Sequence, residues 1–236
     1  MLSGKKLTAV IPVRAGSKGI PGKNLRKIGK YSLLERAIKL AESEPRIDQI
    51  LVSTDDPEMY ELAQSYSVAT PDPRPDHLAT DEARTFDVIQ DLLESGALQK
   101  GVLLLLQATS PLRTSADLKR LLDEYDSKGD GAFVSLCENK GEPPEKLQII
   151  SEGQVASFMG SEQGRPRQNM SETYEINGAF YLIDTELLQR AKTFIPEGTY
   201  PFLMPRERSA NLDVMEDWDV LQAMLETGRC HFEEYE

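Results

Sequence analysis

The sequence predicts an α/β fold, in which a mostly parallel sheet is covered by helices on both faces. Two observations indicate this fold. Short apolar runs, such as residues 7–13 and 102–107, alternate with segments whose apolar residues recur at helical spacing. These runs are almost continuously apolar, which is typical of parallel strands buried on both faces. A length of 236 residues is compatible with one domain of this kind.

The first half of the chain follows this alternation closely. After the first strand, residues 14–24 form a glycine-rich basic loop, and residues 32–44 carry apolar side chains at helical spacing. Residues 49–53 (QILVS) predict the second strand. Asp56 followed by Pro57 is typical of a helix start, with Asp at the N-cap and Pro at the first helical position.

The middle of the chain continues the same pattern. A segment with three prolines is expected to be a long loop, because proline interrupts both helices and strands. The expected elements here are the loop at 70–81, a helix at 83–94, a strand at 102–107, a loop at 108–114, a helix at 115–125 and a strand at 131–136.

The alternation is interrupted at residues 138–175, which are polar and contain Pro143-Pro144 and several glycines. We interpret this segment as a subdomain inserted into a single domain of residues 1–236. The pattern resumes with a strand at 177–183 and ends with a helix at 215–225. The acidic residues 233–236 are expected to form a frayed tail.

The composition narrows the possible partners. Asp and Glu number 39 against 27 Lys and Arg, which gives a net charge of −12. Nucleic-acid polymers bind basic surfaces, so we expect no such partner. No apolar run approaches the roughly 20 residues that cross a bilayer and no leader opens the chain, so we expect no membrane contact. Two cysteines make no disulfide framework, and a cytoplasmic location is expected.

The loop RAGSKGIPGKN at residues 14–24 carries the strongest functional signal. It follows the first strand directly, and ligands of open α/β sheets bind at the carboxyl ends of strands. Its three glycines allow close approach of the backbone, whose N–H groups can surround phosphate, while Arg14, Lys18 and Lys23 add positive charge. The loop matches neither GxGxxG nor GxxxxGK[ST]. The alternative interpretation is a solvated basic loop without a ligand.

Residues 7–25 (LTAVIPVRAGSKGIPGKNL) resemble the signature loop of the cytidylyltransferases that activate acidic sugars, the CMP-sialic acid synthetases. The resemblance implies a Rossmann-like nucleotidyltransferase fold and a reaction in which CTP and a sugar acid give a CMP-sugar and pyrophosphate. It extends in order over almost the whole chain through STD at 53–55, RPDHLATD at 74–81, LQATSPLR at 106–113, PRQ at 166–168, NGAFY at 177–181 and LDVMEDW at 212–218.

The resemblance also implies how CTP is bound. The basic loop would hold the triphosphate, and Lys23 would stabilise the charge of the leaving pyrophosphate. Arg74, Asp81 and Thr85 would lie beside the cytosine and ribose. The implied catalytic residues are Lys23, Arg14 and Asp213. The implied phosphate contacts come from Arg14, Ser17, Lys18, Lys23 and Asn24.

The acceptor side and the metal are likewise implied by the resemblance. Asp213 would bind Mg²⁺ with Asn211 beside it, and Mg²⁺ prefers few carboxylates completed by phosphates and water. Relatives use the region at 138–175 as a dimerisation arm, so a homodimer is expected. The residues implied to line the sugar acid are Gln107, Thr109, Arg167, Gln168 and Tyr181, with Arg167 and Gln168 near the site of the partner subunit.

Two positions depart from the pattern of relatives. Asn211 stands where many relatives have Asp, which removes one charge from the metal site. Glu175 stands where some sialic acid enzymes have Arg, which reverses a charge. The expected substrate is therefore sialic acid or a relative such as legionaminic or pseudaminic acid. The alternatives are a 3-deoxy-manno-octulosonate-type cytidylyltransferase and a nucleotide-binding protein without catalysis.

Four further polar residues keep two interpretations each. Asp55 could hold nucleotide or metal, or act as a turn or capping residue. Arg113 could contact a ligand or bond the carbonyls of the loop that it ends. Arg206 and Arg208 could face the sugar acid or be solvated on a loop.

Overall fold

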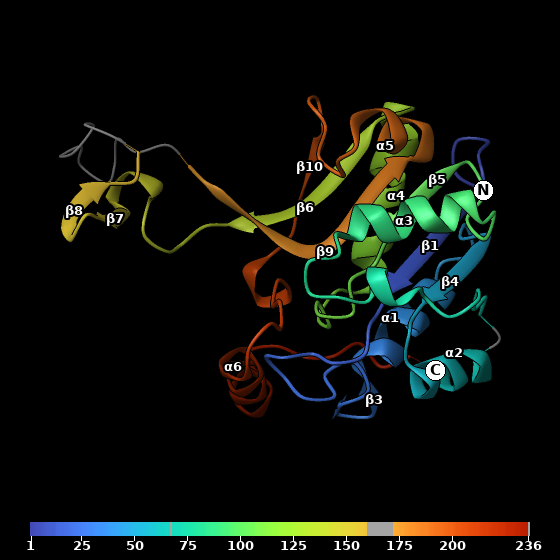
Figure 1. Cartoon of the computed structure of the whole chain (residues 1–236), viewed down its shortest axis with the longest axis horizontal. Helices are drawn as coiled ribbons and strands as arrows, with labels where there is room; N and C mark the ends of the chain where they lie inside the picture. The colour runs from blue at the N-terminus through green and yellow to red at the C-terminus, as the bar shows by residue number, and fades with distance from the viewer. Residues whose placement is uncertain (67, 160–171, 236) are drawn as a thin grey trace.

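The computed structural model describes residues 1–66, 68–159 and 172–235 (Figure 1). A six-stranded sheet runs through the body in the order β10-β6-β9-β5-β1-β4. Its strands are β1 (Leu7–Pro12), β4 (Gln49–Ser53), β5 (Val102–Leu105), β6 (Ala132–Glu138), β9 (Tyr174–Asp184) and β10 (Tyr200–Leu203).

Within this sheet, β9 is the strand that runs against the others, since it pairs antiparallel with β5 on one side and β6 on the other. The remaining pairs, β1 with β4, β1 with β5 and β10 with β6, are parallel. The predicted mostly parallel sheet is therefore confirmed.

Helices cover both faces of the sheet. Ala9 and Ile11 of β1 belong to the larger core cluster with α1, α4 and α6, whereas Val10 belongs to the cluster with α3 and α5. Successive side chains of a strand point to opposite faces, so a strand buried on both sides needs both layers. The helices are α1 (Leu33–Glu42), α2 (Pro57–Ser65), α3 (Thr85–Glu94), α4 (Ser115–Lys128), α5 (Thr185–Ala191) and α6 (Met215–Glu226).

The predicted capping chemistry sets where the helices begin. Asp56 accepts a hydrogen bond from the Met59 N–H at 3.0 Å, and Pro57 is the first residue of α2. Ser32 and Glu35 form a reciprocal capping box at the start of α1. These bonds satisfy N–H groups that have no partner inside the helix.

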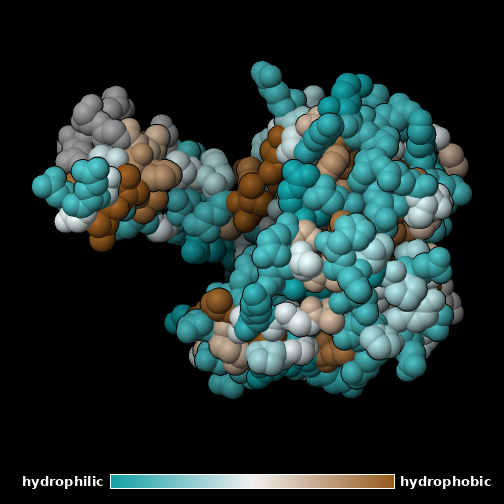
Figure 2. Space-filling view, in the orientation of Figure 1, coloured by the Kyte–Doolittle hydropathy of each residue, from teal (hydrophilic) through white to brown (hydrophobic). Residues whose placement is uncertain are grey.

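The segment predicted as an insertion projects away from the body (Figure 1). β6 and β9 continue past the edge of the sheet as a two-stranded neck, where Cys137 pairs with Glu175. The neck leads to the hairpin of β7 (Gln148–Ser151) and β8 (Gln154–Ser157). Apolar side chains are exposed on this arm, with Ile150 83% and Val155 75% exposed, as the brown areas of Figure 2 show.

Several element boundaries differ from the prediction. β5 ends at Leu105, so Gln107 lies in the loop that follows. β9 begins at Tyr174 because it forms the neck as well as the sheet. α5 and β10 were not predicted. The remaining short elements are β2 (Lys27–Ile28), β3 (Tyr31–Ser32) and the 3-10 turns η1 (Asp76–Leu78), η2 (Pro144–Lys146) and η4 (Arg206–Arg208).

The prediction of a frayed tail is wrong for residues 233–235. The Glu233 carboxylate accepts hydrogen bonds from the N–H and hydroxyl of Ser115 at 2.6 and 2.5 Å, at the start of α4. Tyr235 packs against the core, and its carbonyl oxygen accepts a bond from the Tyr31 hydroxyl at 3.2 Å. A carboxylate at a helix N-terminus also meets the positive end of the helix dipole, which favours this docking.

Among the described helices, none is both long and apolar enough to cross a lipid bilayer.

Candidate active site

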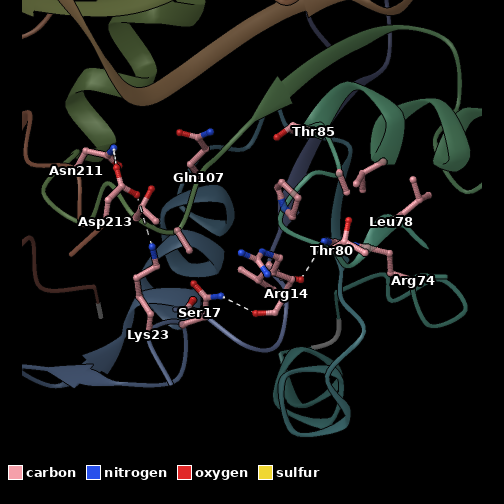
Figure 3. Close-up of a pocket in the computed structure, with 17 residues that line it drawn as sticks. Arg14, Ser17, Lys23, Arg74, Leu78, Thr80, Thr85, Gln107, Asn211 and Asp213 are labelled. Carbon is pink, nitrogen blue, oxygen red and sulfur yellow. Dashed lines mark hydrogen bonds and ion pairs between the residues drawn. The ribbon is translucent and has the colours of Figure 1, made fainter. Parts of the chain in front are cut away.

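A cavity of about 360 Å³ opens where β1 and β5 end (Figure 3). Figure 3 shows Lys23, Asn211 and Asp213 at one end and Arg74, Leu78 and Thr85 at the other. The predicted site residues that line it are Arg14, Ser17, Lys23, Asn24, Arg74, Thr85, Gln107, Thr109, Asn211 and Asp213. The structure thus brings most of the sequence-predicted residues to one place, at the carboxyl ends of parallel strands.

Two side chains, Asp55 and Asn24, hold the basic loop in place by hydrogen bonds to its backbone. The Asp55 carboxylate accepts a hydrogen bond from the Ala15 N–H at 2.9 Å. The Asn24 amide donates to the Arg14 carbonyl oxygen at 3.2 Å. In this structure Asp55 therefore stabilises a turn of the basic loop. Asn24, predicted to touch phosphate, is buried and holds the loop closed, although it also lines the cavity.

Lys23 connects this loop to the segment before α6. Its ammonium donates to the Leu212 carbonyl oxygen at 2.8 Å and lies 3.7 Å from the Asp213 carboxylate. The Lys23 side chain is only 12% exposed, and this burial lowers its pKa, against the opposing effect of Asp213. The result is a positioned cation beside an accessible carboxylate, because the Asp213 side chain is 65% exposed.

The segment at 211–213 is anchored through Leu212. Its side chain is fully buried, and its N–H donates to the Thr109 carbonyl oxygen at 2.9 Å. The flanking side chains, Asn211 and Asp213, reach the cavity, and the Asn211 amide donates to the Asp213 carboxylate at 2.8 Å. A polar pair is thus presented beside the Lys23 ammonium.

Gly19 packs against the backbone of this segment with no room for a side chain. A Cβ at this position would lie 2.0 Å from the Asp213 carbonyl oxygen, which no side chain can tolerate without movement of the backbone. Sequence reasoning treated the glycines of the loop as equivalent and missed this contact.

The far end of the cavity is built around Arg74. Its Nε atom donates to the Ser53 hydroxyl at 3.2 Å and its Nη2 atom to the carbonyl oxygens of Val13, at 3.0 Å, and Ser53. Burial lowers the pKa of Arg74 to about 10, so the guanidinium remains charged at neutral pH. Leu78 and Val88 line the cavity beside it but were not predicted, because apolar residues of loops and helices resemble ordinary core residues.

Asp81, which the resemblance places near the cytosine and ribose, is engaged by the basic loop. Its carboxylate pairs with both Arg14 and Lys18. The pKa of Asp81 is lowered most by the hydrogen bond from Lys18 and next by the hydrogen bond from Arg14. The Asp81 carboxylate is therefore ionised at neutral pH. In this structure Asp81 therefore neutralises two cations of the basic loop.

The acceptor-side residues are brought together only in part. Gln107 and Thr109 line the cavity. Tyr181 lies on β9 with its ring centroid 5.8 Å from that of Phe194, and it is not among the residues lining this cavity. Arg167 and Gln168 lie outside the described residues.

The arginines with two interpretations bind protein atoms. Arg113 is buried and donates to the Ala179 carbonyl oxygen at 2.8 Å. Arg208 makes two hydrogen bonds of 2.8 Å to the buried Asp117. Arg206 lies 3.8 Å from Glu175, and both line a second cavity of about 690 Å³ between the neck and α6, which shares Asn211 with the first.

A family model described as cytidylyltransferase matches residues 8–159, more than half of the chain. The chain belongs to the cytidylyltransferase family. The family predicted from the basic loop and the motifs that follow it is confirmed.

Two relatives match this chain over most of its length. It is 31% identical to an N-acylneuraminate cytidylyltransferase of Streptococcus agalactiae over 90% of this chain, but spans only 52% of that protein, about half. It is 28% identical to the CMP-N,N'-diacetyllegionaminic acid synthase of Legionella pneumophila over 95% of this chain and 98% of that protein.

A solved structure supports the fold assignment. CMP:2-keto-3-deoxy-manno-octonic acid synthetase complexed with CTP aligns with a TM-score of 0.69 at 15% identity. The alignment covers 94% of this chain and 99% of that one. The predicted nucleotidyltransferase fold is confirmed by this neighbour.

If the chain binds CTP, as the resemblance implies, we expect Gly19→Ala to weaken that binding at least about tenfold, since the new Cβ forces the basic loop away from the segment at 211–213. Isothermal calorimetry with CTP measures the effect. Gly96→Asn, outside the basic loop, is the matched control, because Gly96 has φ +77° with nothing within 4 Å of its Cβ, and Asn tolerates this backbone region. Unchanged affinity in Gly19→Ala would show that the close contact is unimportant.

Proposed function

We propose that this cytidylyltransferase transfers CMP from CTP to an acidic nonulosonic sugar. The anomeric hydroxyl oxygen of the sugar forms a bond to the α-phosphorus and loses its proton to solvent. The bond from that phosphorus to the bridging oxygen breaks, and pyrophosphate leaves with the electron pair. The observation that carries the proposal is the Lys23 ammonium held beside Asp213 in a cavity formed by the basic loop. The names of the streptococcal and Legionella relatives support the choice of acceptor.

The triphosphate belongs at the basic loop under this proposal. Arg14, Ser17 and Lys18 would bind phosphate oxygens together with backbone N–H groups. Lys23 would stabilise the negative charge that grows on the leaving pyrophosphate, and its burial strengthens that interaction. Asp81 would release Arg14 and Lys18 to the phosphates, since one carboxylate cannot share these cations with a triphosphate without repulsion.

The nucleoside belongs at the opposite end of the cavity. The bonds that the described residues make with Arg74 use its Nε and Nη2 atoms, which leaves Nη1 for an acceptor atom of the cytosine. Leu78 and Val88 offer an apolar surface to the ring. Thr85 would bond the ribose.

Mg²⁺ is part of the proposal. When bound, it would neutralise phosphate charge and orient the triphosphate. Among the described residues no group of three His, Cys, Asp or Glu side chains could hold a metal. A single carboxylate still fits Mg²⁺, because phosphates and water complete its shell. Asp213 would be the protein's charged ligand. In this structure the side-chain amide of Asn211 donates a hydrogen bond to the Asp213 carboxylate. A rotation of that amide by half a turn would present its oxygen to Mg²⁺.

The acceptor would be met by Gln107 and Thr109 in the cavity. The resemblance adds Tyr181 on β9, together with Arg167 and Gln168, which lie outside the described residues. A homodimer is proposed because the segment at 138–175 resembles the dimerisation arm of relatives, and each arm would then reach the site of the partner subunit. The exposed Ile150 and Val155 supply apolar surface for such contacts. A cytoplasmic location completes the proposal, since CTP is an intracellular metabolite.

The decisive test is the release of pyrophosphate from CTP and Mg²⁺ with a panel of sugar acids. The panel should hold N-acetylneuraminic, legionaminic, pseudaminic and 3-deoxy-manno-octulosonic acids. We expect turnover with a nonulosonic acid, and Lys23→Met should lower it at least about tenfold, because the stabilising cation is lost. Turnover only with the octulosonic acid favours that alternative, and CTP binding without release favours a binding protein.

The metal assignment predicts that Asn211→Asp saturates at a lower Mg²⁺ concentration, because a second carboxylate adds charge at the ligand position. Turnover is measured against Mg²⁺ concentration for both proteins. Asp219→Asn on the exposed face of α6 serves as the control for a change of one charge. Identical Mg²⁺ dependence in wild type and Asn211→Asp would remove residue 211 from the metal site.

The proposed dimer predicts a molecular mass of two chains by light scattering at micromolar concentration. Ile150→Asp combined with Val155→Asp should shift the protein toward the monomer, because charges replace the exposed apolar surface of the arm. A monomer mass for the wild-type chain would contradict the proposal.

A further inference from the structure

A buried polar network lies next to the active-site cavity and involves residues without a role so far. Its centre is Asn177 on β9, which is 3% exposed. Here the pairing of β6 with β9 shifts register between Val134 and Leu136. The shift places the buried Ser135 hydroxyl 2.6 Å from Asn177 Oδ1. Such an irregularity in a sheet is typically kept for a local purpose.

The Asn177 side chain uses both ends of its amide. Oδ1 accepts the Ala179 N–H at 3.2 Å, and Nδ2 donates to the Ser209 hydroxyl oxygen at 2.8 Å. Ser209 in turn donates to the Pro205 carbonyl oxygen at 2.8 Å, which leaves its oxygen as the acceptor. The donors and acceptors therefore match in one amide orientation only.

The Asn177 backbone reaches a third segment. Its carbonyl oxygen accepts the Ser110 hydroxyl at 3.1 Å, in the loop after β5 that carries Gln107 and Thr109. Ser209 stands two residues before Asn211. Asn177 thus joins β9 to two segments. One carries Gln107 and Thr109, and the other carries Asn211.

Gly178 extends this connection to the side chains themselves. It has φ +72°, and a Cβ there would lie 2.6 Å from Gln107 Oε1 and 3.5 Å from Asn211 Oδ1. The backbone next to Asn177 therefore packs directly under both side chains. Any displacement of Asn177 moves the surface on which Gln107 and Asn211 rest.

We propose that Asn177 is a positioning residue, which sets the places of Gln107, Thr109 and Asn211 relative to the bound nucleotide. The inference rests on the proposed function for its kinetic consequences. None of the hydrogen bonds of Asn177 among the described residues reaches the basic loop or Arg74. Its removal should therefore affect acceptor use and leave CTP affinity nearly unchanged.

The test compares Asn177→Ala with wild type in two assays. We expect kcat/KM for the sugar acid to fall at least about tenfold, since displacements of about 1 Å can cost about a hundredfold in rate. The dissociation constant for CTP, measured by calorimetry in the absence of Mg²⁺, should change less than about twofold. Ser127→Ala at the exposed end of α4 is the control. Unchanged acceptor kinetics, or an equal loss of CTP affinity, would overturn the proposal.

Two milder variants keep the test decisive if Asn177→Ala fails to fold. Ser110→Ala and Ser209→Ala each remove one connection of Asn177. Each should lower kcat/KM for the acid about threefold without changing CTP affinity. Wild-type kinetics in both variants would overturn the proposal.

A readout without turnover separates this inference from the proposed function. In Ser110→Ala, amide hydrogen exchange should become faster at residues 107–112. In Ser209→Ala, it should become faster at residues 209–213. In both variants residues 14–24 should keep their wild-type rates. This result would support the positioning role even if no sugar acid in the panel reacts. Uniform acceleration over the whole chain would contradict it.

Discussion

The active site depends on how Leu212 is held. Its side chain is fully buried, its N–H is bonded to Thr109 and its carbonyl oxygen accepts the Lys23 ammonium. A buried backbone N–H or carbonyl group without a hydrogen-bond partner would cost free energy. The bonds to Thr109 and Lys23 therefore satisfy the backbone of Leu212 where its side chain is buried. Leu212 is buried in the core, while the residues on either side of it, Asn211 and Asp213, line the cavity. One apolar side chain thereby sets the position of the polar pair.

The sheet topology explains why distant segments meet at this point. The parallel strands β1 and β5 deliver the basic loop and the Gln107 loop to the same edge. The antiparallel β9 passes beside β5 and carries Asn177 beneath that edge. The register shift against β6 is what makes room for the Ser135 and Asn177 side chains. The antiparallel strand is thus the element that joins the catalytic edge to the projecting arm.

Much of this could be predicted from local sequence, and the exceptions share a cause. Apolar periodicity, the Asp56-Pro57 helix start and the loop after β1 depend on neighbouring residues, and all three were predicted. The docking of Glu233 on Ser115, the pairing of Asp81 with Arg14 and the contact of Gly19 with Asp213 join residues far apart in sequence. Periodicity reports which side of an element is buried. It carries no information about the direction of β9 or the partner of a charge.

The position of Asp81 explains how an acidic protein could bind an anionic ligand at its basic loop. The net charge of −12 disfavours the approach of a triphosphate, and the free basic loop would otherwise hold three cations in close proximity. Asp81 relieves that repulsion by pairing with Arg14 and Lys18, while Lys23 is satisfied by Leu212 and Asp213. In the proposed function, nucleotide binding would therefore exchange the Asp81 carboxylate for the triphosphate. Such an exchange would cost less than assembling unpaired cations around the triphosphate, because Asp81 already holds Arg14 and Lys18 side by side.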